Sequence, residues 1–251
     1  MIFLSYILSV TGLLNGLITS FTETEKEMVS VERAHQFEKI ESENWLGTEE
    51  MPIGWPNEPF VEFSNVTMQY NIQDDNALNG ISFCINPGEK IGICGRTGSG
   101  KSSIFMALFR GEELKSGTIR IDNVNIRNIN LNTLRQSMSI IPQDPFLFDG
   151  TLRENLDLSN KCDDNQLWNA LRKCRLDMKF RIEPTGLDFR IEEKGKNLSS
   201  GEKQLICLAR AILTNRKILC IDEATASVDF ETDNFIQQTI RKEFRHATIV
   251  N

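Results

Sequence analysis

IGICGRTGSGKSS, residues 91–103, joins an apolar segment to a glycine-rich loop and then to a second apolar segment. Within it, Gly95 to Ser102 match the pattern GxxxxGK(S/T) of a P-loop. Glycines let the backbone bend tightly and point consecutive N–H groups at phosphate oxygens. The flanks EKIGIC (89–94) and SSIFMALFR (102–110) supply the strand and the helix that this motif requires. A glycine-rich turn without a ligand is the alternative, and the flanks count against it.

The residues of this loop have separate expected tasks. Lys101 is expected to reach the β- and γ-phosphates of a nucleotide, and the Ser102 hydroxyl to bind Mg²⁺. The helix that begins near Lys101 adds the positive end of its dipole to the site. The candidate nucleotide-binding residues here are Gly95, Arg96, Thr97, Gly98, Ser99, Gly100, Lys101, Ser102 and Ser103.

A second apolar segment, KILCI (217–221), ends in two carboxylates, Asp222 and Glu223. An aspartate at such a strand end holds Mg²⁺ through water. The next carboxylate is placed to orient and deprotonate an attacking water. Asp222 follows Lys101 by 121 positions in the same predicted sheet, so we interpret the pair as part of the phosphate site. The alternative is a solvated strand end without a ligand.

The sequence NLSSGEKQ (197–204) opens another predicted helix. Ser199 and Glu202 have the spacing of a capping box, in which each side chain satisfies the other's backbone N–H. One interpretation is a helix cap and nothing more. The other is a second anion site at a helix N-terminus.

The order of the predicted elements indicates an α/β fold with a mainly parallel sheet and helices on both faces. The predicted strands are 60–70, 80–85, 90–94, 117–121, 138–141, 217–221 and 247–250. The predicted helices after the P-loop are 131–136, 163–175, 200–214 and 235–244. The expected parts are a helical segment over 1–40, a polar linker over 41–59 and a nucleotide-binding domain over 60–251.

The N-terminal segment is predicted to be a transmembrane helix. Residues 2–21 carry no charge, and eleven of these twenty are Leu, Ile, Phe or Val. That length spans a bilayer core at helical rise. A buried helix of a soluble domain is the alternative, whereas a signal peptide would need a basic start and a small-residue cleavage site.

Composition excludes several classes of site. The net charge is −7 and no basic stripe with interleaved aromatics occurs, so nucleic-acid binding is not expected. The six cysteines form no CxxC pair, which favours reduced thiols over disulfides. The two histidines have no metal-ligand neighbour in the sequence.

Together these motifs resemble those of the ATP-binding cassette, or ABC, transporter family. GRTGSGKSS (95–103) is similar to its Walker A motif, ILCIDE (218–223) to Walker B, and LSSGEKQ (198–204) to its signature. The resemblance implies an ABC-type P-loop NTPase domain with a helical subdomain, preceded by one transmembrane helix.

Three shorter stretches extend the resemblance. Pro142, Gln143 and Asp144 resemble the Q-loop, which implies that Gln143 reaches the metal and the attacking water. Tyr70 stands where the family places the aromatic ring that stacks on adenine. The third stretch, Ser227 to Asp229 with Val228 between them, resembles the D-loop.

Longer stretches of the sequence narrow the resemblance to subfamily C, the multidrug resistance-associated type. It is carried by WPNEPFVEFSNVTMQY (55–70), PFLFDGTLRENLD (145–157) and CIDEATASVD (220–229). The implied function is an ATP-hydrolysing domain that powers export of amphipathic organic anions or drugs. The implied partners are the first nucleotide-binding domain in a head-to-tail ATP sandwich, the transmembrane domains and the lipid bilayer. The implied location is an integral membrane protein whose nucleotide-binding domain is cytoplasmic.

The resemblance also assigns roles to residues. Glu223, Lys101 and Gln143 are the implied catalytic residues, with ATP as substrate. Ser102, Gln143 and Asp222 are the implied Mg²⁺ ligands. Ser199 and Gly201 are implied to contact the nucleotide of the partner domain.

Departures from the family pattern set further expectations. Ser200 and Glu202 stand where glycine or valine and glutamine are commoner. The switch histidine that the family has after its final strand is not present before Asn251, so we interpret the chain as a C-terminal fragment that is nearly inactive alone. Two alternatives stay open: a nucleotide-sensing regulatory domain with little turnover, and a soluble ABC ATPase of chromosome-maintenance type.

Overall fold

The chain forms two compact units, Met1–Asn44 and Trp45–Asn251, which are described separately. The computed structural model describes residues 2–40, 42–43, 45–71, 75–223 and 228–251.

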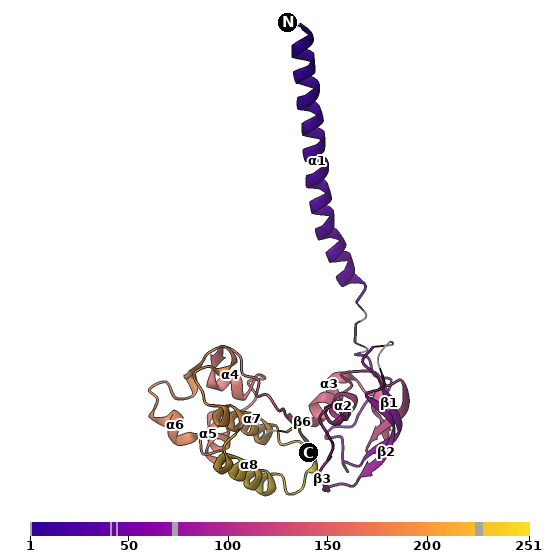
Figure 1. Ribbon diagram of the computed structural model, residues 1–251. Helices are drawn as coiled ribbons and strands as arrows, with labels where there is room; N and C mark the ends of the chain where they lie inside the picture. The colour runs from indigo at the N-terminus through magenta and orange to yellow at the C-terminus, as the bar shows by residue number, and fades with distance from the viewer. Residues whose placement is uncertain (1, 41, 44, 72–74, 224–227) are drawn as a thin grey trace. The chain divides into compact units, whose positions relative to one another are not determined.

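The first unit is mainly one helix, α1 (Ile2–Glu38) (Figure 1). Its described side chains are all exposed. A search of the described residues finds no helix with the length and apolarity that crossing a membrane requires. The predicted N-terminal helix is therefore confirmed as a helix, but its prediction as a membrane span is not confirmed.

Half of the second unit is built on an antiparallel sheet, with the strand order β2-β1-β4-β5. The strands are β1 (Val61–Met68), β2 (Leu78–Ile85), β4 (Ser116–Ile121) and β5 (Val124–Asn125). The rings of Phe63 and Phe83, which are paired residues on β1 and β2, stack with centroids 4.4 Å apart. The prediction of a mainly parallel sheet is wrong for this half. The connection between β1 and β2 is too short for a parallel crossover, which takes a dozen or more residues.

The other sheet is parallel throughout, with the order β3-β10-β9-β6. Its strands are β3 (Lys90–Ile91), β6 (Met138–Ile141), β9 (Ile218–Ile221) and β10 (Thr248–Val250). Of the strand predicted over 90–94, only Lys90 and Ile91 form β3 and pair with β10. This sheet matters for function because the carboxyl ends of its strands lie at one edge.

All four residues of β9 are buried, and they alternate between two hydrophobic clusters. Ile218 and Cys220 pack with α2 (Lys101–Leu108) and the antiparallel sheet. Leu219 and Ile221 pack with helices on the opposite face. This is the period of two that a strand covered on both faces requires.

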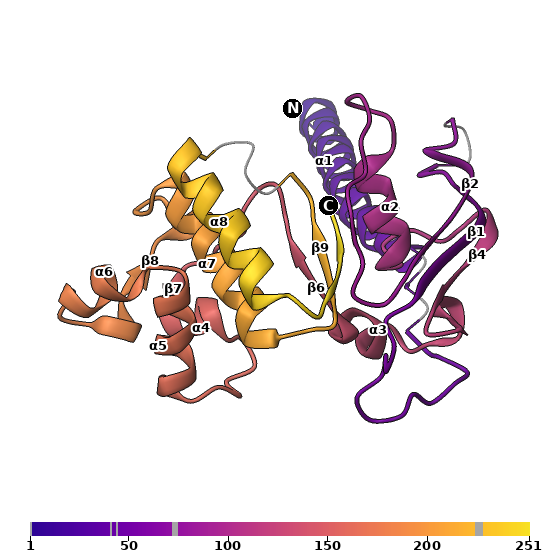
Figure 2. The same ribbon diagram turned by 90° about the horizontal axis from the view of Figure 1, so that it is seen from below.

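The helices on that opposite face follow β6 along the chain (Figure 2). They are α4 (Leu152–Leu156), α5 (Asp164–Lys173), α6 (Asp177–Ile182), α7 (Ser200–Thr214) and α8 (Phe230–Glu243). The remaining elements are α3 (Leu131–Ser137), β7 (Gly150–Thr151), β8 (Arg190–Ile191), and the 3-10 turns Ile126–Asn128, Gly186–Asp188 and Glu193–Gly195. The helix predicted over 200–214 is confirmed, α8 begins earlier than predicted, and α4 and α6 were not predicted.

Candidate active site

The glycine-rich loop after β3 leads directly into α2. Gly98 and Gly100 have φ angles of 81° and 89°, in the left-handed region that favours glycine. A Cβ on Gly100 would lie 2.5 Å from the carbonyl oxygen of Ala77, so this position also requires glycine for space. Because Gly100 caps α2 without a side chain, the first turn of the helix has no side-chain cap. Such a terminus suits an anion.

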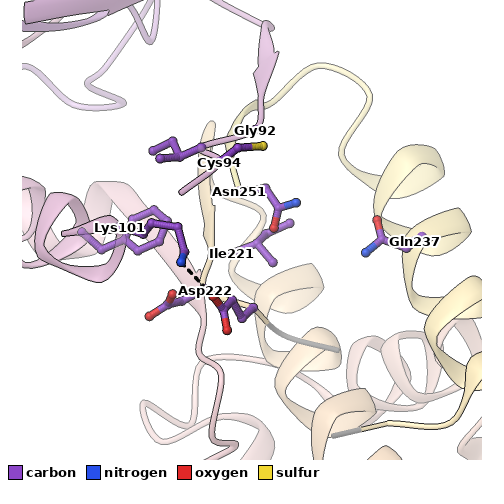
Figure 3. A pocket seen from close by; sticks show the side chains of 10 residues that line it. Gly92, Cys94, Lys101, Ile221, Asp222, Gln237 and Asn251 are labelled. Atoms are coloured by element: carbon purple, nitrogen blue, oxygen red, sulfur yellow. Dashed lines mark ion pairs between the residues drawn. The ribbon is translucent and has the colours of Figure 1, made fainter. Parts of the chain in front are cut away.

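Lys101 folds back over this loop toward a carboxylate. Its Nζ donates to the carbonyl oxygens of Gly95 and Arg96, at 3.1 Å and 3.4 Å. The same Nζ lies 3.4 Å from Oε1 of Glu223, the ion pair drawn as a dashed line in Figure 3. The P-loop cation and the carboxylate that ends the Walker B-like sequence therefore lie close together.

Ser102 and Asp222 form a second link between the loop and the parallel sheet. The Ser102 Oγ donates to Oδ1 of Asp222 at 3.1 Å. The backbone N–H of Asp222 donates to the Ile141 carbonyl oxygen at 3.0 Å, which continues the pairing of β9 with β6 past the end of the strand. The aspartate is thus held at the carboxyl edge of the sheet, beside the start of α2.

Glu223 has an unusual backbone conformation. Its φ is 43°, a left-handed value that is rare for residues with a side chain. Such strain is found where the position of a side chain matters to function. Gln143, two residues after the end of β6, lies near it, and Nε2 of Gln143 donates to Oε2 of Glu223 at 3.4 Å. Lys101 and Gln143 therefore contact the two different oxygens of one carboxylate.

Tyr70 lies beside the start of α2. Its hydroxyl is 3.0 Å from Oγ of Ser103 in α2. A cavity of about 400 Å³ opens here, within the size range of small-molecule sites. It is lined by Tyr70, Ala77, Thr97, Gly98, Gly100, Lys101, Ser102, Ser103, Gln143 and Glu223.

A second cavity, of about 410 Å³, is also lined by Lys101 and Glu223 (Figure 3). Its lining includes Cys94, Gln237 and Asn251, to which the sequence analysis assigned no role in the site. They come from the loop after β3, from α8 and from the residue after β10. No local motif marks them, because the three segments meet only when the sheet forms.

Comparison with known proteins agrees with this geometry. The family model described as "ABC transporter" matches residues 78–226. The chain belongs to the ABC transporter family. The match runs from β2 to just beyond Glu223, so it includes the P-loop, Gln143 and Ser199.

Within the ABC transporter family, the chain is similar to curated proteins of subfamily C. It is 49% identical to mouse ATP-binding cassette sub-family C member 10, over 98% of this chain and 17% of that protein. It is 46% identical to human sub-family C member 3, over 98% of this chain and 16% of that protein. The chain thus spans about a sixth of the length of these relatives.

A solved structure is also similar, that of a bacterial Atm1-family ABC exporter with ATP bound. The two share 32% identity with a TM-score of 0.73, over 84% of this chain and 36% of that chain. The similarity to subfamily C and the ABC-type nucleotide-binding fold are therefore both shown. That exporter was solved with ATP bound, which makes the P-loop cavity the place to test for a nucleotide here.

The signature-like residues of this ABC domain are not brought to the P-loop. Ser199 caps α7 by accepting the Glu202 N–H at 3.2 Å, and the Glu202 carboxylate accepts the Ser199 N–H at 2.9 Å. The predicted capping box is confirmed. Among the described residues that line the two cavities, neither Ser199 nor Gly201 occurs. Their predicted contact with a partner's nucleotide stays a prediction.

The D-loop prediction falls partly outside the described residues, because Ser227 is one of those not described. Asp229 caps α8, and its carboxylate accepts the Thr232 N–H at 3.0 Å. The hydrogen bonds from Thr232 lower the pKa of Asp229.

The side-chain oxygens of Ser102 and Asp222 are of the type that binds Mg²⁺. They face each other across a hydrogen bond, and magnesium prefers hard oxygen ligands from one or two protein groups together with phosphates and water. Within the described part of the chain, no three His, Cys, Asp or Glu side chains gather as a metal cluster.

The ion pair between Lys179 and Glu202 yields a pH prediction for this domain. Nζ of Lys179 lies 2.6 Å from Oε1 of Glu202 and joins α6 to the start of α7. Burial alone would raise the pKa of Glu202, but hydrogen bonds from Lys179 and Ser199 outweigh burial and lower it. A lowered folded pKa stabilises the fold above the unfolded pKa, and the gain is lost as pH falls through the folded pKa.

We therefore expect Lys179→Met to destabilise the domain by about 0.2–1 kcal/mol at neutral pH. The difference from wild type should shrink at acid pH, where Glu202 is protonated in both proteins. Urea unfolding followed at several pH values measures this. A difference that stays constant or grows toward acid pH would contradict it.

Proposed function

We propose that this chain is the ATP-binding and ATP-hydrolysing domain of a membrane exporter. The observation that carries the proposal is the meeting of Lys101, Ser102, Gln143, Asp222 and Glu223 beside the P-loop, with contacts of 3.1–3.4 Å. Three separate segments supply these side chains: the start of α2, the loop after β6 and the turn after β9. Each is of the type that phosphoryl transfer from ATP to water requires.

The residues would act in distinct ways on ATP. Lys101 offsets charge that develops on the γ-phosphate, and the α2 N-terminus adds its dipole. Glu223 orients the attacking water and accepts its proton, and Gln143 holds that water and the Glu223 carboxylate in place. Bound Mg²⁺ would be held by Ser102, Asp222 and Gln143 and would neutralise phosphate charge.

The rest of the proposed transporter lies outside this chain. Ser199 and Gly201 would contact the nucleotide of a second nucleotide-binding domain, since they lie away from the P-loop of their own domain. The uncharged part of α1 would belong to the membrane portion, because its apolar side chains are exposed. Within subfamily C, the sequence favours the type of multidrug resistance-associated protein seven. The cargo would be amphipathic organic anions or drugs. The nucleotide-binding domain would lie in the cytoplasm.

Tyr70 provides a test of how the nucleotide lies. If its ring stacks on adenine, Tyr70→Ala should weaken Mg·ATP binding by about 5- to 150-fold, the equivalent of about 1–3 kcal/mol. Tyr70→Phe keeps the ring but loses the contact with Ser103, so it should bind nearly as wild type does. Calorimetry on the whole chain measures both affinities. No binding by wild type would overturn the proposed function, whereas equal affinity of all three would overturn only the adenine position.

A further inference from the structure

Gln204 lies on α7, one turn after Gly201, and is the last residue of the signature-like stretch 198–204. Its Nε2 donates to the carbonyl oxygen of Pro142 at 3.1 Å and to that of Gln143 at 3.0 Å. These acceptors are 62 and 61 positions away in the sequence. A single amide therefore joins α7 to the backbone of the segment that carries Gln143.

The environment of Gln204 makes these two bonds significant. The residue is 1% exposed and stands among buried apolar neighbours of α7, such as Leu205 and Ile206. Its Oε1 is buried and accepts no hydrogen bond from the described residues. An unsatisfied buried oxygen is unfavourable, so an apolar side chain would suit packing better. The part of Gln204 that is used is its donor group, and both of its acceptors belong to one segment.

The far end of that segment is held by the same helix. Nη1 of Arg210 donates to the Phe146 carbonyl oxygen at 2.6 Å, and Arg210 also contacts Asn155 at the end of α4. Residues 142–146 are thus fixed to α7 at both ends. From this clamp the side chain of Gln143 extends toward Oε2 of Glu223.

We propose that Gln204 is a positioning residue that sets where Gln143 stands at the metal and water site. The inference rests on the proposed function, because it assumes that Gln143 faces Mg·ATP. Gln204 lines neither cavity beside the P-loop. It acts by fixing the carbonyl groups of Pro142 and Gln143, which flank the Cα from which the Gln143 side chain extends. Since Ser199 and Gly201 precede it on α7, a shift of that helix terminus would move Gln143 as well.

The test is a double-mutant cycle on the whole chain. Calorimetry gives ATP affinity with and without Mg²⁺, and the ratio is the gain that Mg²⁺ provides. Gln143→Ala should reduce this gain about tenfold, as loss of groups that support a metal site does. Gln204→Met keeps the size of the side chain but removes its donor, and it should reduce the gain similarly. The double variant should lose no more of this gain than Gln143→Ala alone, because both changes remove the same placement of the Gln143 side chain.

Thr214→Val is the matched control. It removes the 2.7 Å hydrogen bond between Ser139 and Thr214 at the other end of α7, and so loosens the helix away from Gln143. This variant should keep the wild-type gain from Mg²⁺. Gln204→Asn, which withdraws the amide by one methylene, replaces Gln204→Met if thermal melting shows that the latter is unfolded.

Two results would overturn the inference. One is that the Gln204 variants keep the wild-type gain in ATP affinity from Mg²⁺, while Gln143→Ala loses that gain. The other is a double variant whose loss is the product of the two single losses, as independent sites give. A wild-type chain that binds no ATP would instead refute the proposed function itself, and the positioning role with it.

Discussion

Glu223→Gln is expected to lower ATP turnover by about 10²–10⁴-fold in the complete transporter, the range for loss of a general base. Glutamine keeps the length of the side chain and one oxygen acceptor, but it cannot take a proton from water. Lys101 loses its charged partner at 3.4 Å yet stays in the P-loop through its bonds to Gly95 and Arg96. Binding of ATP should therefore persist while hydrolysis fails.

Phosphate release from the purified, membrane-reconstituted protein measures turnover, and nucleotide retention on the same sample measures binding. Glu58→Gln is the matched control, because Glu58 is exposed and precedes β1, outside both cavities. It should hydrolyse at the wild-type rate. Wild-type turnover by Glu223→Gln would show that another group is the base. Tight ATP binding with negligible turnover by the wild type would instead favour the regulatory alternative.

The sequence predicted the parts of this site that depend on local pattern. The P-loop glycines, the buried strand that ends at Asp222 and the capping box of Ser199 each lie within a few consecutive residues. Their physical requirements, a left-handed turn, a strand buried on both faces and a satisfied helix terminus, are met by neighbours in sequence. Such features can be recognised without knowing how the chain is folded.

What the sequence did not predict depends on distant pairing. The antiparallel sheet follows from the register of Phe63 with Phe83 and Ile119, which no periodicity reveals. The clamp that Gln204 makes on the Gln143 segment joins positions about sixty residues apart. A polar residue inside the apolar stripe of α7 was the one available signal, since a buried amide calls for a partner. It could have raised the question but could not have named Pro142 and Gln143 as the acceptors.

Recognition of the site therefore came from combining local motifs with the order of the strands. Walker-like sequences predicted that Lys101 and Asp222 belong to one site, and the parallel sheet supplies the reason. The P-loop follows β3 and Asp222 follows β9, so both leave the carboxyl edge of the same sheet. The left-handed φ of Glu223 was not predictable, because it arises where the chain turns immediately after that edge.

Lys101→Ala is expected to weaken binding of ATP by about 10- to 150-fold, the equivalent of about 1.5–3 kcal/mol for hydrogen bonds to a charged group. Lys101 is the P-loop side chain whose cation faces the cavity beside Ser102 and Glu223. Its removal also takes away the positive charge that would offset negative charge developing on the γ-phosphate in the transition state, so turnover of the complete transporter should fall by a further factor of about 10²–10³. Ser102 and Asp222 keep their contact, so the fold should survive.

Calorimetry on the whole chain measures the loss of affinity, and phosphate release from the reconstituted transporter at saturating ATP measures the separate loss of turnover. Lys161→Ala is the control for removal of a positive charge, since Lys161 is exposed in the loop between α4 and α5. If screening of phosphate charge by any lysine were enough, both variants would lose affinity alike. If Lys101 acts through its place in the P-loop, only Lys101→Ala does. Equal affinity of Lys101→Ala and wild type would mean that the nucleotide does not occupy this loop.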